Sequence, residues 1–130
     1  MRALLPPGWP RPKGYSNGIS AKGRMIFTAG VVGWDEREQF VASDLPGQLA
    51  QVLRNTLAIL AEDGAGPEHI VRMTWYVTSR DSYIAHVAEI GAVYREIVGK
   101  HFPAMAVVEV SALIEPSALI EIETTAVVPE

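Results

Sequence analysis

The sequence predicts an α+β fold in which a mixed β-sheet carries two helices on one face. Two segments place apolar residues at every third or fourth position, the spacing of a helix with one buried side. Shorter apolar or alternating segments precede, separate and follow them, which predicts strands in the order β-β-α-β-α-β-β. Helices gathered on one side of a sheet give a two-layer α+β architecture.

Composition limits the possible functions. The chain has 130 residues, no cysteine and a net charge of −4, so we expect one domain without disulfides, thiolate metal sites or thiol nucleophiles. An acidic chain is a poor candidate for binding nucleic acid. No apolar run approaches the roughly 18 residues of a membrane span, and Pro6 and Pro7 interrupt the N-terminal apolar residues before a signal peptide could form. We therefore expect a cytoplasmic protein.

The first 14 residues are rich in proline and glycine, which predicts an extended N-terminal arm (1–14) followed by a single domain (15–130). Trp9 in this arm is expected to pack on the domain or on a neighbouring subunit. Residues 15–19 and 25–29 are short strand candidates, and Lys22-Gly23 between them favours a hairpin. Residues 34–40 are polar and predict a loop.

The first helix is predicted to begin after Ser43 or Asp44, either of which can cap it, with Pro46 in its first turn. Its apolar face consists of leucines spaced by four, four and three residues: Leu49, Leu53, Leu57 and Leu60. Glu62-Asp63-Gly64 ends it.

A strand is predicted over 70–77, with Val71, Met73, Trp75 and Val77 on one face. A second helix starts at Asp81-Ser82 and stops before Gly99. Its buried side is predicted to consist of Tyr83, Val87, Ile90, Val93, Tyr94 and Ile97. Strands follow over 104–113 and 119–128.

With both helices on one side, the other face of the sheet stays bare, and its side chains are too apolar to face water. This face is expected to pack against another copy of the chain.

Metal and cofactor sites are not predicted. His69, His86 and His101 lack metal-ligand spacing, and Gly30-Val31-Val32-Gly33 is too short a glycine motif, with no helix after it, to hold a phosphate.

Three carboxylates stand out because Glu109, Glu121 and Glu123 lie inside apolar strands, where an isolated charge is costly. They could pair with basic residues at a subunit boundary, for which the candidates are Arg72, Arg24 and Lys100. Alternatively, one of them orients or deprotonates a water molecule. Tyr15 is either ordinary aromatic packing or a phenol that lines a pocket.

Three segments together resemble the RidA/YjgF family of enamine and imine deaminases. They are Gly14-Tyr15-Ser16-Asn17-Gly18, Phe27-Thr28-Ala29-Gly30, and Phe102-Pro103-Ala104-Met105-Ala106-Val107-Val108-Glu109-Val110 running on to Ile120-Glu121-Ile122-Glu123. The resemblance implies a chorismate-mutase-like fold and a homotrimer with clefts between subunits. In the deaminating members an arginine holds the substrate carboxylate and a glutamate positions water. By position that glutamate is Glu121, and Tyr15 and the backbone at Gly30 line the cleft.

The arginine does not carry over, because this chain has Met105 where the family motif reads F-P-A-R. Ala29 replaces a common serine and Ala88 a common asparagine, so the cleft is less polar than usual. A thioether cannot clamp a carboxylate as a guanidinium does. We expect weak or no activity on the usual small 2-imino acids.

Two functions remain open. In a divergent C–N hydrolase, Glu121 positions water, the backbone near Gly30 and Ala106 binds the reacting group, and Met105 contacts an apolar part of the substrate. The alternative is a trimer that binds a small ligand without chemistry. Ribonuclease activity, an older label for some relatives, has no support in this acidic chain.

Overall fold

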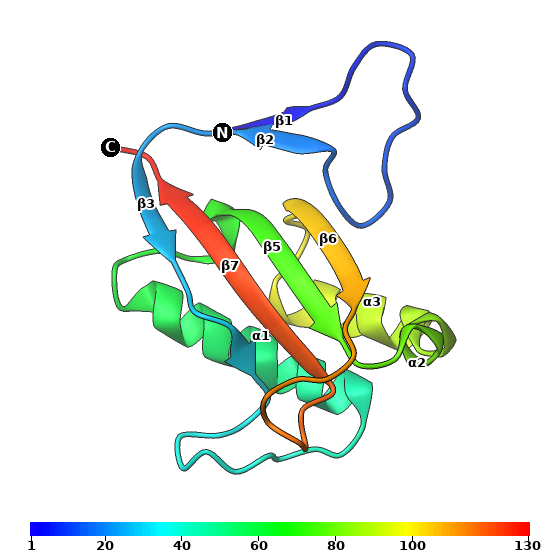
Figure 1. Ribbon diagram of the computed structural model, residues 1–130. Coiled ribbons are helices and arrows are strands. Elements are labelled where there is room, and N and C mark those ends of the chain that lie inside the picture. The colour runs from blue at the N-terminus through cyan, green and yellow to red at the C-terminus, as the bar shows by residue number, and fades with distance from the viewer.

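The computed structural model describes all 130 residues and contains a five-stranded mixed sheet with its long helices on one face (Figure 1). The strands are β3 (Arg24–Phe27), β4 (Val31–Val32), β5 (Ile70–Val77), β6 (Ala104–Glu109) and β7 (Ile120–Val128). Their order is β3-β7-β5-β6, and β4 also pairs with β7. Only β5 and β6 run parallel. The predicted α+β class with a mixed sheet is confirmed.

The predicted hairpin between residues 15–19 and 25–29 is wrong. β2 (Gly18–Ser20) pairs with β1 (Arg2–Leu4) in a separate two-stranded sheet, whereas β3 pairs with β7. The long loop between β1 and β2 first extends away from the main sheet (Figure 1) and then returns to it, where Ser16 bonds to Pro103 just before β6. The physical reason is that β3 gains a long central partner in β7, while β2 would offer it only three residues.

The first helix agrees with the sequence: α1 spans Leu45–Ala61 and buries one apolar side against the sheet. Asp44 precedes it in an extended conformation, although its side chain makes no capping hydrogen bond. Pro46 occupies the first turn, where its missing N–H costs nothing. After the helix, Gly64 adopts a φ of 75°, which favours glycine.

The predicted second helix is in fact two helices, α2 (Arg80–Ala85) and α3 (Val87–Ile97), separated at His86. The His86 backbone leaves the helical region, with φ −107° and ψ 14°, and its ring Nδ1 lies 2.8 Å from the Ser82 carbonyl oxygen. Of the predicted apolar side, Ile90 and Tyr94 are fully buried, whereas Tyr83, Val93 and Ile97 are partly buried against the core and Val87 is largely exposed. A short 3-10 helix, η1 (Pro67–His69), precedes β5.

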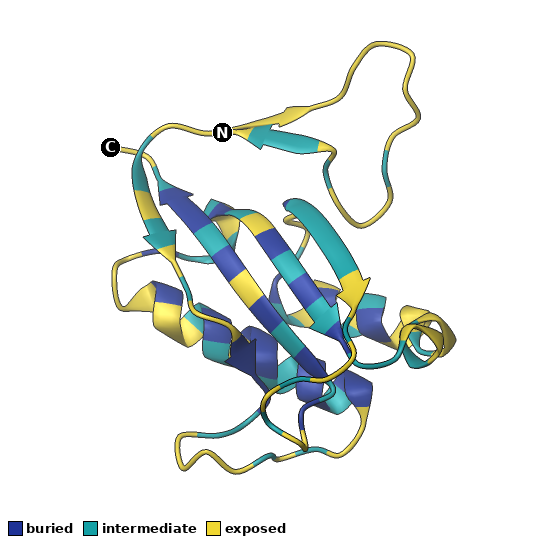
Figure 2. Ribbon diagram, in the orientation of Figure 1, coloured by how far each residue is buried: buried dark blue, intermediate teal, exposed yellow.

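The core lies between the helices and one face of the sheet. Buried and accessible residues alternate along β5 and β7 (Figure 2), as expected for strands with one covered face. Met73, Trp75 and Val77 point into this core, as the sequence predicts, but the register shift between Ile70 and Arg72 places Ile70 there in place of the predicted Val71. Each large apolar side chain removed from water contributes about 1.5–3 kcal/mol to stability.

The opposite face of the sheet carries no helix, and we call it the open face. Strand pairing aligns on it residues of β3, β5, β6 and β7: Met25, Phe27, Arg72, Thr74, Tyr76, Ala104, Ala106, Val108, Glu121, Glu123, Thr125 and Val127. Met25 and Phe27 are largely exposed there. None of the helices has the length and apolar character that crossing a bilayer requires.

β6 is shorter than the predicted strand over 104–113 because pairing with β5 ends at Glu109. The Glu109 side chain accepts a hydrogen bond from the Arg80 backbone N–H at 2.7 Å, at the start of α2. This carboxylate therefore satisfies a free helix-terminal donor and is not buried among apolar residues.

Candidate functional site

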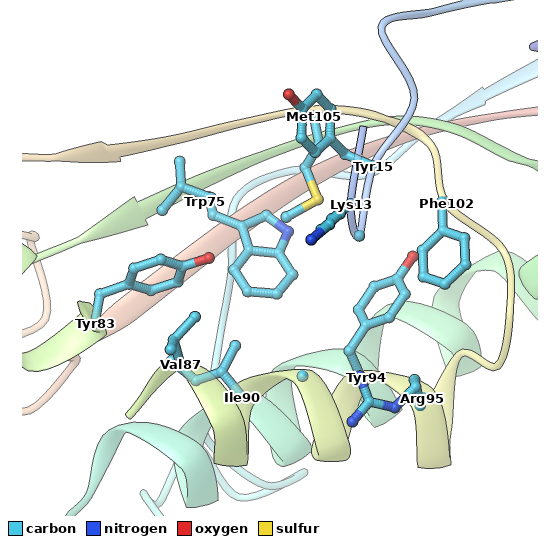
Figure 3. A pocket seen from close by; sticks show the side chains of 13 residues that line it. Lys13, Tyr15, Trp75, Tyr83, Val87, Ile90, Tyr94, Arg95, Phe102 and Met105 are labelled. Carbon is cyan, nitrogen blue, oxygen red and sulfur yellow. The ribbon is translucent and has the colours of Figure 1, made fainter. Parts of the chain in front are cut away.

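A cavity of about 390 Å³ lies between β5, β6, helices α2 and α3, and the N-terminal loop (Figure 3). Volumes of roughly 300–1,000 Å³ are usual for small-molecule sites. Nine of its thirteen lining residues are hydrophobic. The lining consists of Lys13, Gly14, Tyr15, Trp75, Tyr83, Val87, Ile90, Gly91, Tyr94, Arg95, Phe102, Met105 and Val107.

Aromatic rings form one side of the cavity. The ring centres of Trp75 and Tyr94 lie 6.2 Å apart, and Tyr94 stacks on Phe102 at the same separation. The Tyr94 hydroxyl donates a hydrogen bond to the His101 carbonyl. Burial raises the pKa of both Tyr94 and Tyr83, so both phenols stay neutral at physiological pH. These rings therefore offer apolar surface without negative charge.

The indole nitrogen of Trp75 has no hydrogen-bond partner although the residue is only 1% exposed. Figure 3 shows this nitrogen on the edge of the indole that faces Lys13 and the Met105 thioether. Buried donors are nearly always paired, and an unpaired one costs about 1–3 kcal/mol. The sequence indicated only that Trp75 belongs to the core.

The charged lining residues are both cations, Lys13 and Arg95, and no Asp or Glu lines the cavity. Neither forms a salt bridge. The Arg95 guanidinium folds over Gly91 one turn earlier on α3, where a Cβ would lie 3.1 Å from its nitrogen. Neither residue is predicted from the sequence. The only local pattern that points to one of them is the spacing of Gly91 and Arg95 on one helix face.

Tyr15 and Met105 both line this cavity. The loop carrying Tyr15 is fastened to the start of β6 by Ser16, whose backbone N–H donates to the Pro103 carbonyl at 3.0 Å. Tyr15 borders the cavity while remaining 43% exposed, and its part in binding stays a prediction.

Glu121 projects from the opposite side of the sheet. It pairs with Tyr76 of β5 and with Val32 of β4, which places it on the open face. Its carboxylate packs against Gly30, where a Cβ would overlap it. Glu123, on the same face, accepts a hydrogen bond of 2.7 Å from the Tyr76 hydroxyl, and this bond is the main reason that the pKa of Tyr76 is raised.

Within one chain the predicted site residues therefore form two groups. Tyr15 and Met105 lie in the cavity, whereas Glu121, Gly30 and Ala106 lie with the open face. Ala29 precedes Gly30 in the exposed loop between β3 and β4, and Ala88 is exposed on α3 without lining the cavity.

The proposed basic partners of the strand carboxylates are not their partners within the chain. Arg24 pairs with Asp63, and neither Arg72 nor Lys100 forms a salt bridge. Glu123 is satisfied by Tyr76 and Glu109 by the α2 backbone, which leaves Glu121 without a hydrogen bond from any residue of its own chain.

Residues 10–128 match the family model described as Endoribonuclease L-PSP. The chain belongs to the RidA/YjgF family. It is 37% identical to a RutC family protein of Pyrococcus abyssi, over 90% of this chain and 89% of that protein. It is 33% identical to the 2-iminobutanoate/2-iminopropanoate deaminase of Salmonella typhimurium, over 87% and 86%.

Solved structures of the RidA/YjgF family agree with this assignment. A Rid-family protein of unknown function from Yersinia pestis has a TM-score of 0.84 and 33% identity, covering 98% of both chains. A YjgF-family member from Mycobacterium tuberculosis has a TM-score of 0.67 and 34% identity, over 89% and 88%. The predicted chorismate-mutase-like fold is confirmed by such structures.

Proposed function

We propose that the protein is a divergent RidA-family hydrolase that acts on an enamine, imine or related small C–N substrate. The observation that carries this proposal is the placement of Glu121, a half-buried carboxylate held over Gly30 with no hydrogen bond from its own chain. A carboxylate free to accept a proton beside an accessible backbone is suited to positioning water. A relative of this chain is named as an imine deaminase.

In this reaction Glu121 accepts a proton from water as the oxygen attacks the C=N carbon. That proton then passes to the nitrogen, and the hydroxyl proton of the tetrahedral intermediate follows it through Glu121 as the C–N bond breaks and the C=O bond forms. Water and the imine thus give a carbonyl compound and ammonia. Backbone groups near Gly30 and Ala106 bind the reacting end of the substrate.

The cleft is proposed to lie between subunits. Glu121 and the cavity with Met105 occupy opposite faces of the sheet, so one chain does not present both to one ligand. A second copy that brings its open face to the cavity supplies the missing carboxylate. The homotrimer that the family resemblance implies has this kind of boundary, and the exposed Met25 and Phe27 support assembly through the open face.

Met105 argues against the usual small 2-imino acids as substrates. A carboxylate loses a bidentate partner when a thioether replaces a guanidinium, and hydrogen bonds to charged groups contribute about 1.5–3 kcal/mol. The same replacement favours the second candidate function, a trimer that binds a small ligand without chemistry.

Ammonia release separates these functions. We would assay 2-iminopropanoate and larger imines for the native chain, Met105→Arg and Glu121→Gln. We expect little turnover of 2-iminopropanoate until Met105→Arg restores it, and turnover of a larger imine that falls about 100-fold or more in Glu121→Gln. Glu123→Gln is the matched control, because this neighbouring carboxylate is already engaged by Tyr76. No turnover by any form would replace the hydrolase with the binding protein.

A further inference from the structure

We propose that the cavity binds a carboxylate that carries an aromatic or bulky apolar group, and that Lys13 and the Trp75 indole N–H hold its anionic end. This deepens the proposed function and rests on it only for the reaction that follows binding. Three features of the cavity support this proposal: the hydrophobic lining, the positive charge and the unpaired Trp75 indole N–H.

The hydrophobic lining of the cavity favours a ligand with a bulky apolar group. Tyr83, Val87, Ile90 and Met105 surround the space with aliphatic and aromatic surface, and nine of the thirteen lining residues are hydrophobic. A cavity of about 390 Å³ is far larger than a three-carbon imino acid. Apolar groups leaving water for such a site gain about 25 cal/mol per Å². A phenyl-sized group therefore fits it better than a methyl group.

The positive charge of the side chains that line the cavity favours an anionic ligand. Lys13 and Arg95 approach from the loop and from α3, and no carboxylate of this chain lines the cavity or pairs with either cation. This local excess of positive charge contrasts with the net charge of −4 on the chain. Cations beside apolar walls attract an anion more strongly than they do in open water.

The unpaired Trp75 indole N–H indicates that the ligand carries a hydrogen-bond acceptor. The Trp75 indole nitrogen is buried, has no partner and faces the space between Lys13 and Met105 (Figure 3). A ligand oxygen in that space satisfies it and reaches the Lys13 ammonium as well. Trp75 and Lys13 thus bind the carboxylate that an arginine at position 105 would hold, although they lie at other positions in the fold.

The test measures binding with 3-phenylpropanoate and its neutral analogue 3-phenylpropanamide, by calorimetry on the full chain. The acid should bind at least about tenfold more tightly than the amide. Lys13→Gln should weaken the acid about tenfold and leave the amide unchanged. Lys22→Gln is the matched control outside the cavity and should change neither. Equal binding of acid and amide, or unchanged acid binding in Lys13→Gln, overturns the proposal.

Trp75 is tested without depending on a core substitution. The chain has three tryptophans, and Trp9→Phe and Trp34→Phe assign the Trp75 indole N–H resonance by elimination. We expect that resonance to move downfield on adding 3-phenylpropanoate, as a hydrogen bond to an anion forms. A Trp75 resonance that stays in place at saturation overturns its role.

The proposed hydrolase activity and the proposed carboxylate site can be refuted independently of each other. Binding of the acid without ammonia release from any imine removes the hydrolase and keeps the carboxylate site. Ammonia release that is indifferent to Lys13→Gln keeps the hydrolase and removes this site.

Discussion

Gly30 sets the position of the proposed catalytic carboxylate. A methyl group at this residue would overlap the Glu121 side chain, whose end is flexible and can rotate away. Gly30→Ala should therefore displace the carboxylate at a cost of less than about 1 kcal/mol in folding free energy. We expect imine turnover to fall at least about tenfold while the thermal unfolding midpoint moves little.

Gly18→Ala is the matched control, since its Cβ would meet only the Leu4 side chain, 3.3 Å away and outside the proposed site. It should leave turnover intact. If Gly30→Ala retained full turnover, close packing of Glu121 on this glycine would have no part in catalysis.

At the same scale, the residues that sequence reasoning found differ in kind from those it overlooked. Glu121, Tyr15 and Met105 lie in motifs, so position along the chain identifies them. Lys13 and Arg95 are long polar side chains that look solvated in any sequence. Only the path of the N-terminal loop, which depends on the Ser16 contact with β6, brings Lys13 to the cavity that Arg95 borders from α3.

Among the elements, Gln48 of α1 fastens two loops to the core. It is 1% exposed, its amide nitrogen donates to the Ala42 and Ser117 carbonyls at 3.1 and 2.9 Å, and its oxygen accepts from the Leu119 N–H at 2.8 Å. Gln48→Leu should leave these backbone groups unpaired and lower the free energy of unfolding by about 2–4 kcal/mol in urea denaturation.

Gln51→Leu, on the same helix, is the comparison. Its amide makes a single hydrogen bond, to the Asn55 side chain, so the loss should stay below about 1 kcal/mol. Equal losses of unfolding free energy in the two variants would show that the effect comes from changing α1 itself and not from losing the Gln48 hydrogen bonds to the loops.

The elements also show where sequence reasoning ends. β5 and α1 were located almost to the residue because strand alternation and leucine spacing are local signals. The pairing of β2 with β1 was not foreseen, since strand partners are chosen by tertiary contacts that leave no local pattern. The break at His86 has no glycine or proline to mark it and depends on a side-chain contact with the Ser82 carbonyl.

For the whole molecule, the open face is the feature that demands a partner. It presents Phe27, 66% exposed, beside the strand that carries Glu121. Burying such a ring contributes about 1.5–3 kcal/mol per subunit, whereas burying a charge there is costly. Phe27→Glu should therefore prevent the proposed trimer from forming, seen by light scattering as a mass of a single 14.1 kDa chain where the native protein is expected to show three.

The same variant should lose imine turnover, because the cleft proposed here takes Glu121 and the cavity from different subunits. Ile114→Glu is the control: this side chain is 94% exposed in a loop, and adding a charge there should change neither mass nor turnover. A Phe27→Glu chain that is monomeric yet fully active would contradict the shared cleft. It would require Glu121 to act with groups of its own chain, which lie on the open face and not around the cavity.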